Sequence, residues 1–508
     1  MTLKAVGVGY KCEFYITLVW KERMVPISLL TGYFCVGVAS SLPSLGAAYL
    51  MVGLGMNASD IANVAIFCSI PWCLKPLIAA ISDKTTCCCG YRRRPYVSLF
   101  SLACGVVMLL TPRFSTRVED SASFVACLAL TSLCICVVDV CLDGSLMVLV
   151  AEEKKTGQEG VSQGHAWAAR VAGATIGAGW GGKVYNFSFT TLMILSSVLP
   201  LMMTIIAFDI PDVKVKRKTR KSRDERVYDY TNRYKCTIFR TTVKTLWECR
   251  LVLGAAILVA IVPEFNTSLF FYMIAGGVGP QALSMVEVAG SMASLGALLI
   301  YNATRPGHRL SFGLGILLNT LAALVGMLMA NDSVPWLLES AAIEAIIAST
   351  ASILCLMPTI TVLGSFASKT NSESTVYSTG LSILNLSGVV SESIASHSMS
   401  SLHITKNDVN SVRIFVGFVS ILSLMTLPTA FCFPRRPKTT TTHMVEYAHP
   451  GMKPKGGGSK TPRQVFTMEE SDSSEDDLGA DTDKEKDGDE TRALSPATKD
   501  ESCAAECV

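Results

Sequence analysis

The sequence predicts an all-α membrane protein with about twelve transmembrane helices in two six-helix halves. Half of the 508 residues are hydrophobic and only 17% are charged, whereas soluble domains average about 25% charged residues. Apolar stretches of about 20 residues, the length that spans a bilayer, recur along the chain. Basic residues gather in alternate connections between these stretches, which is the pattern of cytosolic loops.

The first half of the chain is predicted to hold six of these spans. Residues 1–24 form a short polar segment without a small-residue cleavage site before the first apolar run, so we expect a cytosolic N-terminal segment and no cleaved signal peptide. The N-terminal six-helix half then covers residues 25–209. Its predicted spans are 25–52, 58–82, 96–112, 122–150, 161–182 and 189–209.

A strongly basic segment, residues 210–248, separates the two halves and is predicted to be a cytosolic loop. The C-terminal half covers residues 249–433. Its predicted spans are 249–274, 279–302, 309–330, 336–363, 374–398 and 411–433. Two equal halves joined by one long loop indicate a duplicated unit, and carriers built in this way bind their substrate between the halves near the membrane midplane. Both ends of the chain are then cytosolic.

The composition changes in the tail, residues 434–508, which runs from threonines through a lysine-glycine stretch to an acidic segment. Such a composition cannot bury enough apolar surface to become ordered, so we expect a disordered cytosolic tail. Ser471, Ser473 and Ser474 lie among acids, as an acidophilic kinase requires, and a solvated spacer is the alternative.

The overall composition also indicates which partners to expect. The net charge is +3, and the basic residues lie beside hydrophobic segments, so we expect membrane lipid and a small molecule as partners and no nucleic acid. The eighteen cysteines lack metal-ligand spacing, which predicts no metal site and reduced thiols; juxtamembrane Cys87, Cys88 and Cys89 are either free or acylated. No nucleophile lies beside a base, and no phosphate-binding loop is present, so we predict neither an enzyme nor a cofactor.

Three charged residues inside the first half are candidate substrate-binding or coupling residues. Lys75 interrupts the second span, where a charge costs about 3 kcal/mol, so it is expected to face a partner or an aqueous cavity unless it reaches the interface. Asp139 and Asp143 lie one helical turn apart on the fourth span and therefore share a face. Two close carboxylates favour proton binding and suit a proton-coupled carrier, whereas nearby cations would make them structural.

The fifth predicted span combines a cation with small residues. Gly173, Gly177 and Gly181 recur every four residues, and this spacing lets helices pack closely. Arg170 lies almost one turn before Gly173 and is a fourth candidate. Trp167 is either a stacking surface for the substrate or a core aromatic side chain.

The depths of these charges suggest that they meet. Counted from the predicted cytosolic ends at about 1.5 Å per residue, Lys75, Asp143 and Arg170 lie about 12, 13 and 15 Å deep. We therefore expect Asp143 to neutralise Lys75 and Arg170 in the empty carrier, with Asp139 as the proton site. A static ion-pair cluster that holds the half together is the alternative.

In the second half, Glu264 is the best candidate among several acids in apolar stretches. It lies beside Pro263, which can break the helix and free backbone carbonyls towards a cavity; alternatively, it is an interhelical hydrogen-bond partner. The weaker candidates are Glu287, Glu339, Glu344 and Glu392.

The connection after the second span has the form of a gating loop. Asp83 precedes Gly90 and the run Arg92, Arg93 and Arg94. This order resembles the acidic-then-basic loop that major facilitator transporters carry between their second and third helices.

Taken together, these features resemble the folate/biopterin transporter family of the major facilitator superfamily. The resemblance rests on Lys75-Pro76-Leu77, Ser82-Asp83, Gly90 to Tyr96, Asp139, Asp143, Gln163, Trp167, Arg170, Gly173, Glu373, Thr375, Tyr377, Ser382 and Asn385. It implies secondary transport of folate, biopterin or a related pterin by alternating access, as proton symport, with the plasma membrane favoured over an organelle membrane. The alternatives are S-adenosylmethionine or another small metabolite as cargo, or a transporter-like receptor or scaffold that does not transport.

Overall fold

The structure is a computed structural model that describes residues 25–84, 91–115, 121–155, 161–212, 240–330, 336–367, 373–404 and 411–434. The predicted N-terminal segment 1–24, most of the 210–248 loop and the tail from residue 435 lie outside the described residues. The chain divides into two compact units, Met1–Thr439 and Thr440–Val508, and every described residue belongs to the first unit.

All the elements of the described ranges are helices. In chain order they are α2 (Ile27–Ser41), α3 (Ser44–Gly53), α4 (Ala58–Cys73), α5 (Lys75–Lys84), α6 (Arg94–Leu110), η1 (Thr111–Phe114), α7 (Ser121–Lys155), α8 (Val161–Tyr185), α9 (Phe189–Ile206), η3 (Ala207–Asp209), α11 (Arg250–Ala260), α12 (Asn266–Ala275), α13 (Pro280–Thr304), α14 (His308–Met329), α15 (Leu337–Ala367), α16 (Glu373–Ser401), α17 (Val412–Met425) and η4 (Leu427–Cys432).

Nine helical stretches of the described chain are long and apolar enough to cross a membrane. They coincide with nine of the predicted spans. The other three predicted spans correspond to α8, to α11 with α12, and to α16. Helix α8 is rich in glycine and α16 in serine, and α11 is separated from α12 by a non-helical stretch. These helices pack against α2, α13, α4 and α15, so small and polar residues here contact protein.

Prolines explain two of the helix breaks. Proline has no N–H group and cannot donate the helical hydrogen bond to the carbonyl four residues earlier. Helices α4 and α5 meet at Leu74, between Pro71 and Pro76, and the break places Lys75 at the first position of α5. Residues 261–265 around Pro263 are non-helical, and they separate α11 from α12 as the sequence predicts.

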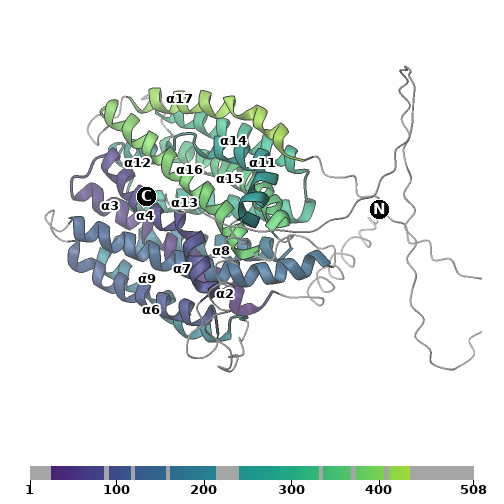
Figure 1. The fold of residues 1–508 in the computed structure, drawn as a ribbon. Coiled ribbons are helices and arrows are strands. Elements are labelled where there is room, and N and C mark those ends of the chain that lie inside the picture. The colour runs from purple at the N-terminus through teal and green to yellow at the C-terminus, as the bar shows by residue number, and fades with distance from the viewer. Residues whose placement is uncertain are drawn as a thin grey trace, which may run out of the picture. The chain divides into compact units, whose positions relative to one another are not determined.

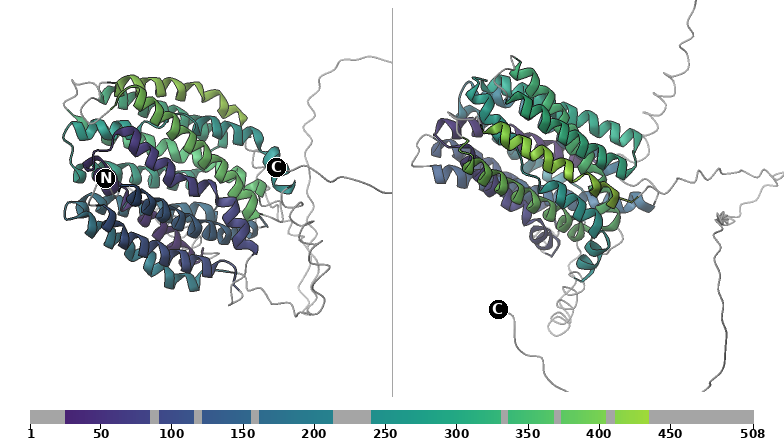
Figure 2. Two further views of the ribbon diagram at one scale, coloured as in Figure 1. Left: turned by 60° about the vertical axis from the view of Figure 1, so that its left-hand side comes forward. Right: turned by 90° about the horizontal axis from the view of Figure 1, so that it is seen from above.

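The helices before residue 213 form the first part of the chain, and the helices after residue 239 form the second part. A few pairs of helices from these two parts pack side by side. Helix α8 lies between α2 and α13, and α4 lies against α16. Among the remaining helices, α6 packs on α9, while α14 packs on both α15 and α17. Figures 1 and 2 show α6 and α9 together on one side and α14 and α17 on the other. The contacts α8–α13 and α4–α16 therefore join helices that lie more than 90 residues apart in the sequence.

The predicted loop 210–248 differs from expectation at its end. Residues 240–248 are helical and lead almost directly into α11. In this stretch Arg240 and Lys244 are exposed together with Val243 and Trp247, whereas Thr242 and Thr245 are buried.

Candidate functional site

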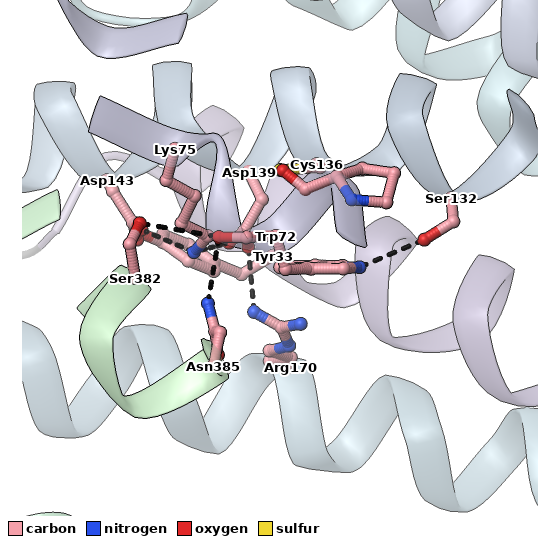
Figure 3. Close-up of polar contacts among 11 residues, drawn as sticks. Tyr33, Trp72, Lys75, Ser132, Cys136, Asp139, Asp143, Arg170, Ser382 and Asn385 are labelled. Atoms are coloured by element: carbon pink, nitrogen blue, oxygen red, sulfur yellow. Dashed lines mark hydrogen bonds and ion pairs between the residues drawn. The ribbon is translucent and has the colours of Figure 1, made fainter. Parts of the chain in front are cut away.

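Asp139 lies at the centre of a buried group of charges formed by α5, α7 and α8 (Figure 3). Its two carboxylate oxygens contact different cations: Lys75 Nζ lies 2.7 Å from Oδ2, and Arg170 Nη1 lies 2.7 Å from Oδ1. Asp139 is fully buried, and Lys75 is 4% exposed. One carboxylate thus pairs with cations from two neighbouring helices.

Asp143, one turn further along α7, completes the group. Its Oδ2 lies 3.4 Å from Lys75 Nζ, and its Oδ1 accepts a 2.7 Å hydrogen bond from the hydroxyl group of Tyr33 on α2. Two acids therefore face two bases, and the charges balance. A balanced, hydrogen-bonded group is the form in which charges are tolerated inside a membrane protein.

The pairing corrects one prediction from the sequence. We expected Asp143 to neutralise both Lys75 and Arg170, but Arg170 pairs with Asp139. Helical spacing correctly places both aspartates on one face of α7. Which of them meets Arg170 depends on how α7 and α8 are rotated and cross, and the spacing along one helix does not contain that information.

Two tryptophan rings border the charges. Lys75 Nζ lies 4.9 Å from the centroid of the Trp72 ring, and the Arg170 guanidinium lies 5.4 Å from Trp72 and 5.3 Å from Trp167. These distances permit cation–π attraction. The indole N–H of Trp72 donates to Ser132 Oγ on α7 at 3.0 Å, which fixes the orientation of the ring.

The proline pattern explains how α16 reaches this site. In a continuous helix the carbonyl of Trp72 would accept from the N–H of residue 76, but residue 76 is proline. The free Trp72 carbonyl instead accepts hydrogen bonds from Asn385 Nδ2 at 3.1 Å and from Ser382 Oγ at 3.4 Å. Figure 3 shows both side chains pointing from α16 towards the break. The second part of the chain therefore contacts the charged group through a backbone atom.

The predicted gating loop is described only in part. Asp83 lies in α5, and its side chain and residues 85–90 lie outside the described residues. Asp212 Oδ2 accepts from the backbone N–H groups of Arg93 and Arg94 at 2.7 and 3.1 Å. The Arg94 guanidinium donates to the Ile210 carbonyl at 2.7 Å and lies over the Tyr91 ring. Arg92, which is half-buried, belongs to the same turn. The start of α6 is thus attached to the segment that follows η3.

The glycine stripe of α8 faces α2. A Cβ atom on Gly177 would lie 2.9 Å from the backbone nitrogen of Leu42, and one on Gly181 would lie 2.8 Å from the Leu42 carbonyl oxygen. A Cβ on Gly173 would overlap the carbonyl group of Phe34. The absence of side chains at these positions lets the two backbones approach, as the spacing predicts for close helix packing.

Glu264 lies in another part of the molecule. It is exposed in the 261–265 break and accepts a 2.6 Å hydrogen bond from Asn266 Nδ2. It lines a cavity of about 510 Å³ whose walls come from α11, α12, α14, α15, α16 and α17. None of its interactions involves the Lys75 group.

Two contributors to the charged group were not predicted as site residues. Trp72 lies three positions before Lys75, and this helical spacing is a signal that was available in the sequence. Tyr33 offers no such signal, because a tyrosine in an apolar span is ordinarily a packing residue, and its partner Asp143 lies 110 positions away.

Comparisons with known proteins agree with this picture. The model of the BT1 family matches residues 36–446. A folate-biopterin transporter from Synechocystis sp. is 25% identical over 418 residues, which cover 79% of this chain and 80% of that protein. A probable chloroplastic folate-biopterin transporter 8 from Arabidopsis thaliana is 25% identical over 312 residues, 57% of this chain and 54% of that protein.

Among solved structures, a crystal structure of a variant of the nucleoside transporter NupG is similar, with a TM-score of 0.53 and 13% identity. The similarity covers 79% of this chain and 98% of NupG. At this identity the likeness concerns the fold alone. The protein is therefore a multi-pass membrane protein with a transporter fold, and its relatives are transporters and not enzymes, as the sequence predicts.

Proposed function

This chain belongs to the BT1 family, and from that premise we propose that it carries a folate, biopterin or related pterin-like molecule across a membrane by proton-coupled alternating access. The proposal includes the twelve-span arrangement in two halves, both ends in the cytosol and the plasma membrane as the location. The names of the Synechocystis and Arabidopsis relatives support the substrate class.

The observation that carries the proposal is the balanced group Lys75, Arg170, Asp139 and Asp143 with its two tryptophan rings. Folate and pterin-like molecules combine a flat heteroaromatic ring with polar or anionic groups. An anionic group can displace Asp139 or Asp143 from the cations, and a flat ring can stack on Trp72 or Trp167. In the structure Asp139 and Asp143 already pair with the cations, so these carboxylates occupy the positions that an anionic group of the substrate would take.

The link to α16 suggests how binding and movement are connected. Asn385 and Ser382 hold the Trp72 carbonyl, three residues from Lys75. A ligand that reorients Lys75 or Trp72 would strain this contact between the two parts of the chain. Alternating access requires contacts of this kind to form in one state and break in another. Arg93 and Arg94, held by Asp212, are the proposed gating-loop residues on the cytosolic side.

The test is uptake of radiolabelled folic acid and biopterin into proteoliposomes. Lys75→Gln and Arg170→Gln should each reduce binding and uptake about ten- to a hundredfold, because a lost charge-assisted hydrogen bond costs about 1.5–3 kcal/mol. The matched control is Lys183→Gln, an exposed cation on the same helix as Arg170, which should leave uptake unchanged. Each variant should retain a single size-exclusion peak.

Other outcomes would identify an alternative. Saturable binding without uptake would favour the receptor or scaffold, and uptake of S-adenosylmethionine but not of folic acid or biopterin would favour the other cargo. If both variants aggregate and the double change Asp143→Asn with Lys75→Gln restores folding and uptake, the charged group is structural.

A further inference from the structure

Three carboxyl groups interact in the second part of the chain, and one of them, that of Glu264, lines the cavity described above. Glu264 comes from the non-helical stretch 261–265, Glu344 from α15 and Glu392 from α16. The carboxyl group of Glu392 lies in hydrogen-bonding contact with that of Glu264, and Glu344 interacts electrostatically with Glu264. Glu264 thus meets like-charged groups from residues that lie 80 and 128 positions further along the chain.

Two of these carboxyl groups, those of Glu344 and Glu392, lack the partners that buried acids require. Glu344 is only 7% exposed, and its Oε1 receives no hydrogen bond; Glu392 Oε2 is likewise buried without a donor. A buried polar atom without a partner costs about 1–3 kcal/mol, and more when it is charged. The contact between Glu392 and Glu264 becomes a hydrogen bond only when one of the two carries a proton.

No described cation neutralises these acids. The ion pairs of Lys75 and Arg170 are made with Asp139 and Asp143, and within the described ranges neither cation contacts Glu264, Glu344 or Glu392. Glu264 is the titratable group that faces both of the others. Other charged groups on the surrounding elements are Asp60 on α4, Arg250 on α11, Glu287 on α13, His308 and Arg309 on α14, Glu339 on α15, His397 on α16 and Arg413 on α17.

The arrangement of the carboxyl groups suits a proton as the positive charge that they lack. A proton needs only two oxygen atoms in contact. Two carboxyl groups that lie side by side repel each other when both are ionised, so one of them tends to keep its proton. The 510 Å³ cavity, which Glu264 lines together with Asn266 and Ser391, gives a proton a route to the pair.

We propose that Glu264 and Glu392 share one proton, and that this pair, with Glu344 as the adjacent acceptor, is a proton-binding site in the second part of the chain. Asn266 holds the Glu264 carboxyl group through its 2.6 Å hydrogen bond. The proton leaves the Glu264–Glu392 pair either to water in the cavity or to Glu344. This assigns the proton to a place other than Asp139, where it would have to displace an ion pair.

The binding of a proton is independent of the proposed cargo, whereas its use in symport rests on the proposed function. When the pair releases its proton, two carboxylates repel each other across the contact between the 261–265 break and α16. The same helix α16 carries Asn385 and Ser382, which contact Trp72. The repulsion that follows proton release would therefore push on α16, the helix that contacts the charged group around Lys75 and Asp139.

Infrared difference spectroscopy of the purified full-length protein tests the site without any substrate. Between a buffer of about pH 6, at which ordinary carboxyl groups are already ionised, and an alkaline buffer, wild type should lose the carbonyl band of a protonated carboxylic acid. Glu264→Gln and Glu392→Gln should each abolish that component, while Glu344→Gln should retain it with a shifted midpoint. Exposed Glu339→Gln on α15 is the control and should leave the spectrum unchanged.

The proposal is overturned if wild type shows no such band, or if the band survives in both Glu264→Gln and Glu392→Gln. Its loss on addition of sodium at constant pH would assign the site to a metal cation and also overturn the proposal. The wild-type titration needs no variant, so misfolding of a variant does not obscure the result. Failure of folic acid and biopterin binding would contradict the proposed function and leave this spectrum unaffected.

Discussion

Asp139 accepts hydrogen bonds from Lys75 and Arg170, whereas Asp143 contacts only Lys75 among the cations and is also held by Tyr33. Asp139→Asn should therefore destabilise the protein by about 3–5 kcal/mol, the cost of leaving a buried ion without its partner. Asp143→Asn should cost less, about 1.5–3 kcal/mol, the value of a hydrogen bond to a charged group, because Lys75 keeps Asp139 and Tyr33 can still donate to the amide oxygen.

Thermal unfolding of the two variants in detergent checks this ranking. The midpoint should fall clearly further for Asp139→Asn than for Asp143→Asn. Equal losses would mean that the two carboxylates share the cations evenly, and a larger loss for Asp143→Asn would contradict the geometry.

At the scale of helices, the contact of α8 with α2 depends on glycine at the crossing. Gly173→Ala would place a methyl group against the Phe34 carbonyl and 3.1 Å from the Val38 nitrogen. Backbone atoms cannot move aside as flexible side chains can, so we expect a destabilisation of about 1–3 kcal/mol from overpacking. The same contact sits beside Arg170, so ligand affinity should fall as well.

Gly296→Ala on α13 is the matched control, because nothing lies within 4 Å of its added methyl group. It should leave the unfolding midpoint unchanged or slightly raised, since alanine is the better helix former. If Gly173→Ala is as stable as this control, the two helices do not pack as tightly as the structure shows.

At the scale of the whole molecule, the orientation in the membrane follows from the distribution of cations. A cysteine-accessibility reporter introduced within residues 210–248 should be protected from a membrane-impermeant reagent in intact cells and react after permeabilisation. The comparison is a reporter at Phe187, an exposed position in the turn between α8 and α9. This reporter should react with the reagent in intact cells. Labelling of the 210–248 reporter from outside would refute the proposed topology.

The tail offers a second prediction at this scale. Deleting residues from 440 onward should leave folic acid binding and the unfolding midpoint unchanged, because the compact unit Met1–Thr439 contains all the residues of both candidate sites. Amounts at the membrane should still be measured, since the deletion removes Ser471, Ser473 and Ser474. A truncated protein that reaches the membrane but has lost binding would show that the tail contributes to the site.

The sequence by itself determined the features that depend on neighbouring residues along the chain. Apolar stretches of spanning length located the helices, Pro263 located the break before α12, and the four-residue spacing placed Asp139 and Asp143 on one face. The resemblance to the folate/biopterin transporter family was likewise carried by short motifs, and the match of the BT1 family model confirms it. These inferences needed only hydrophobicity and helical periodicity.

Only the tertiary structure decided which residues meet. Arg170 pairs with Asp139 and not with Asp143, Tyr33 joins the group from α2, and Asn385 of α16 takes the Trp72 carbonyl that Pro76 leaves free. Similarly, Glu264 in the non-helical stretch 261–265 acquires Glu392 of α16 as a neighbour. The physical reason is that a helix fixes the angular position of its own side chains, whereas its rotation and crossing angle are set by packing against helices distant in the sequence.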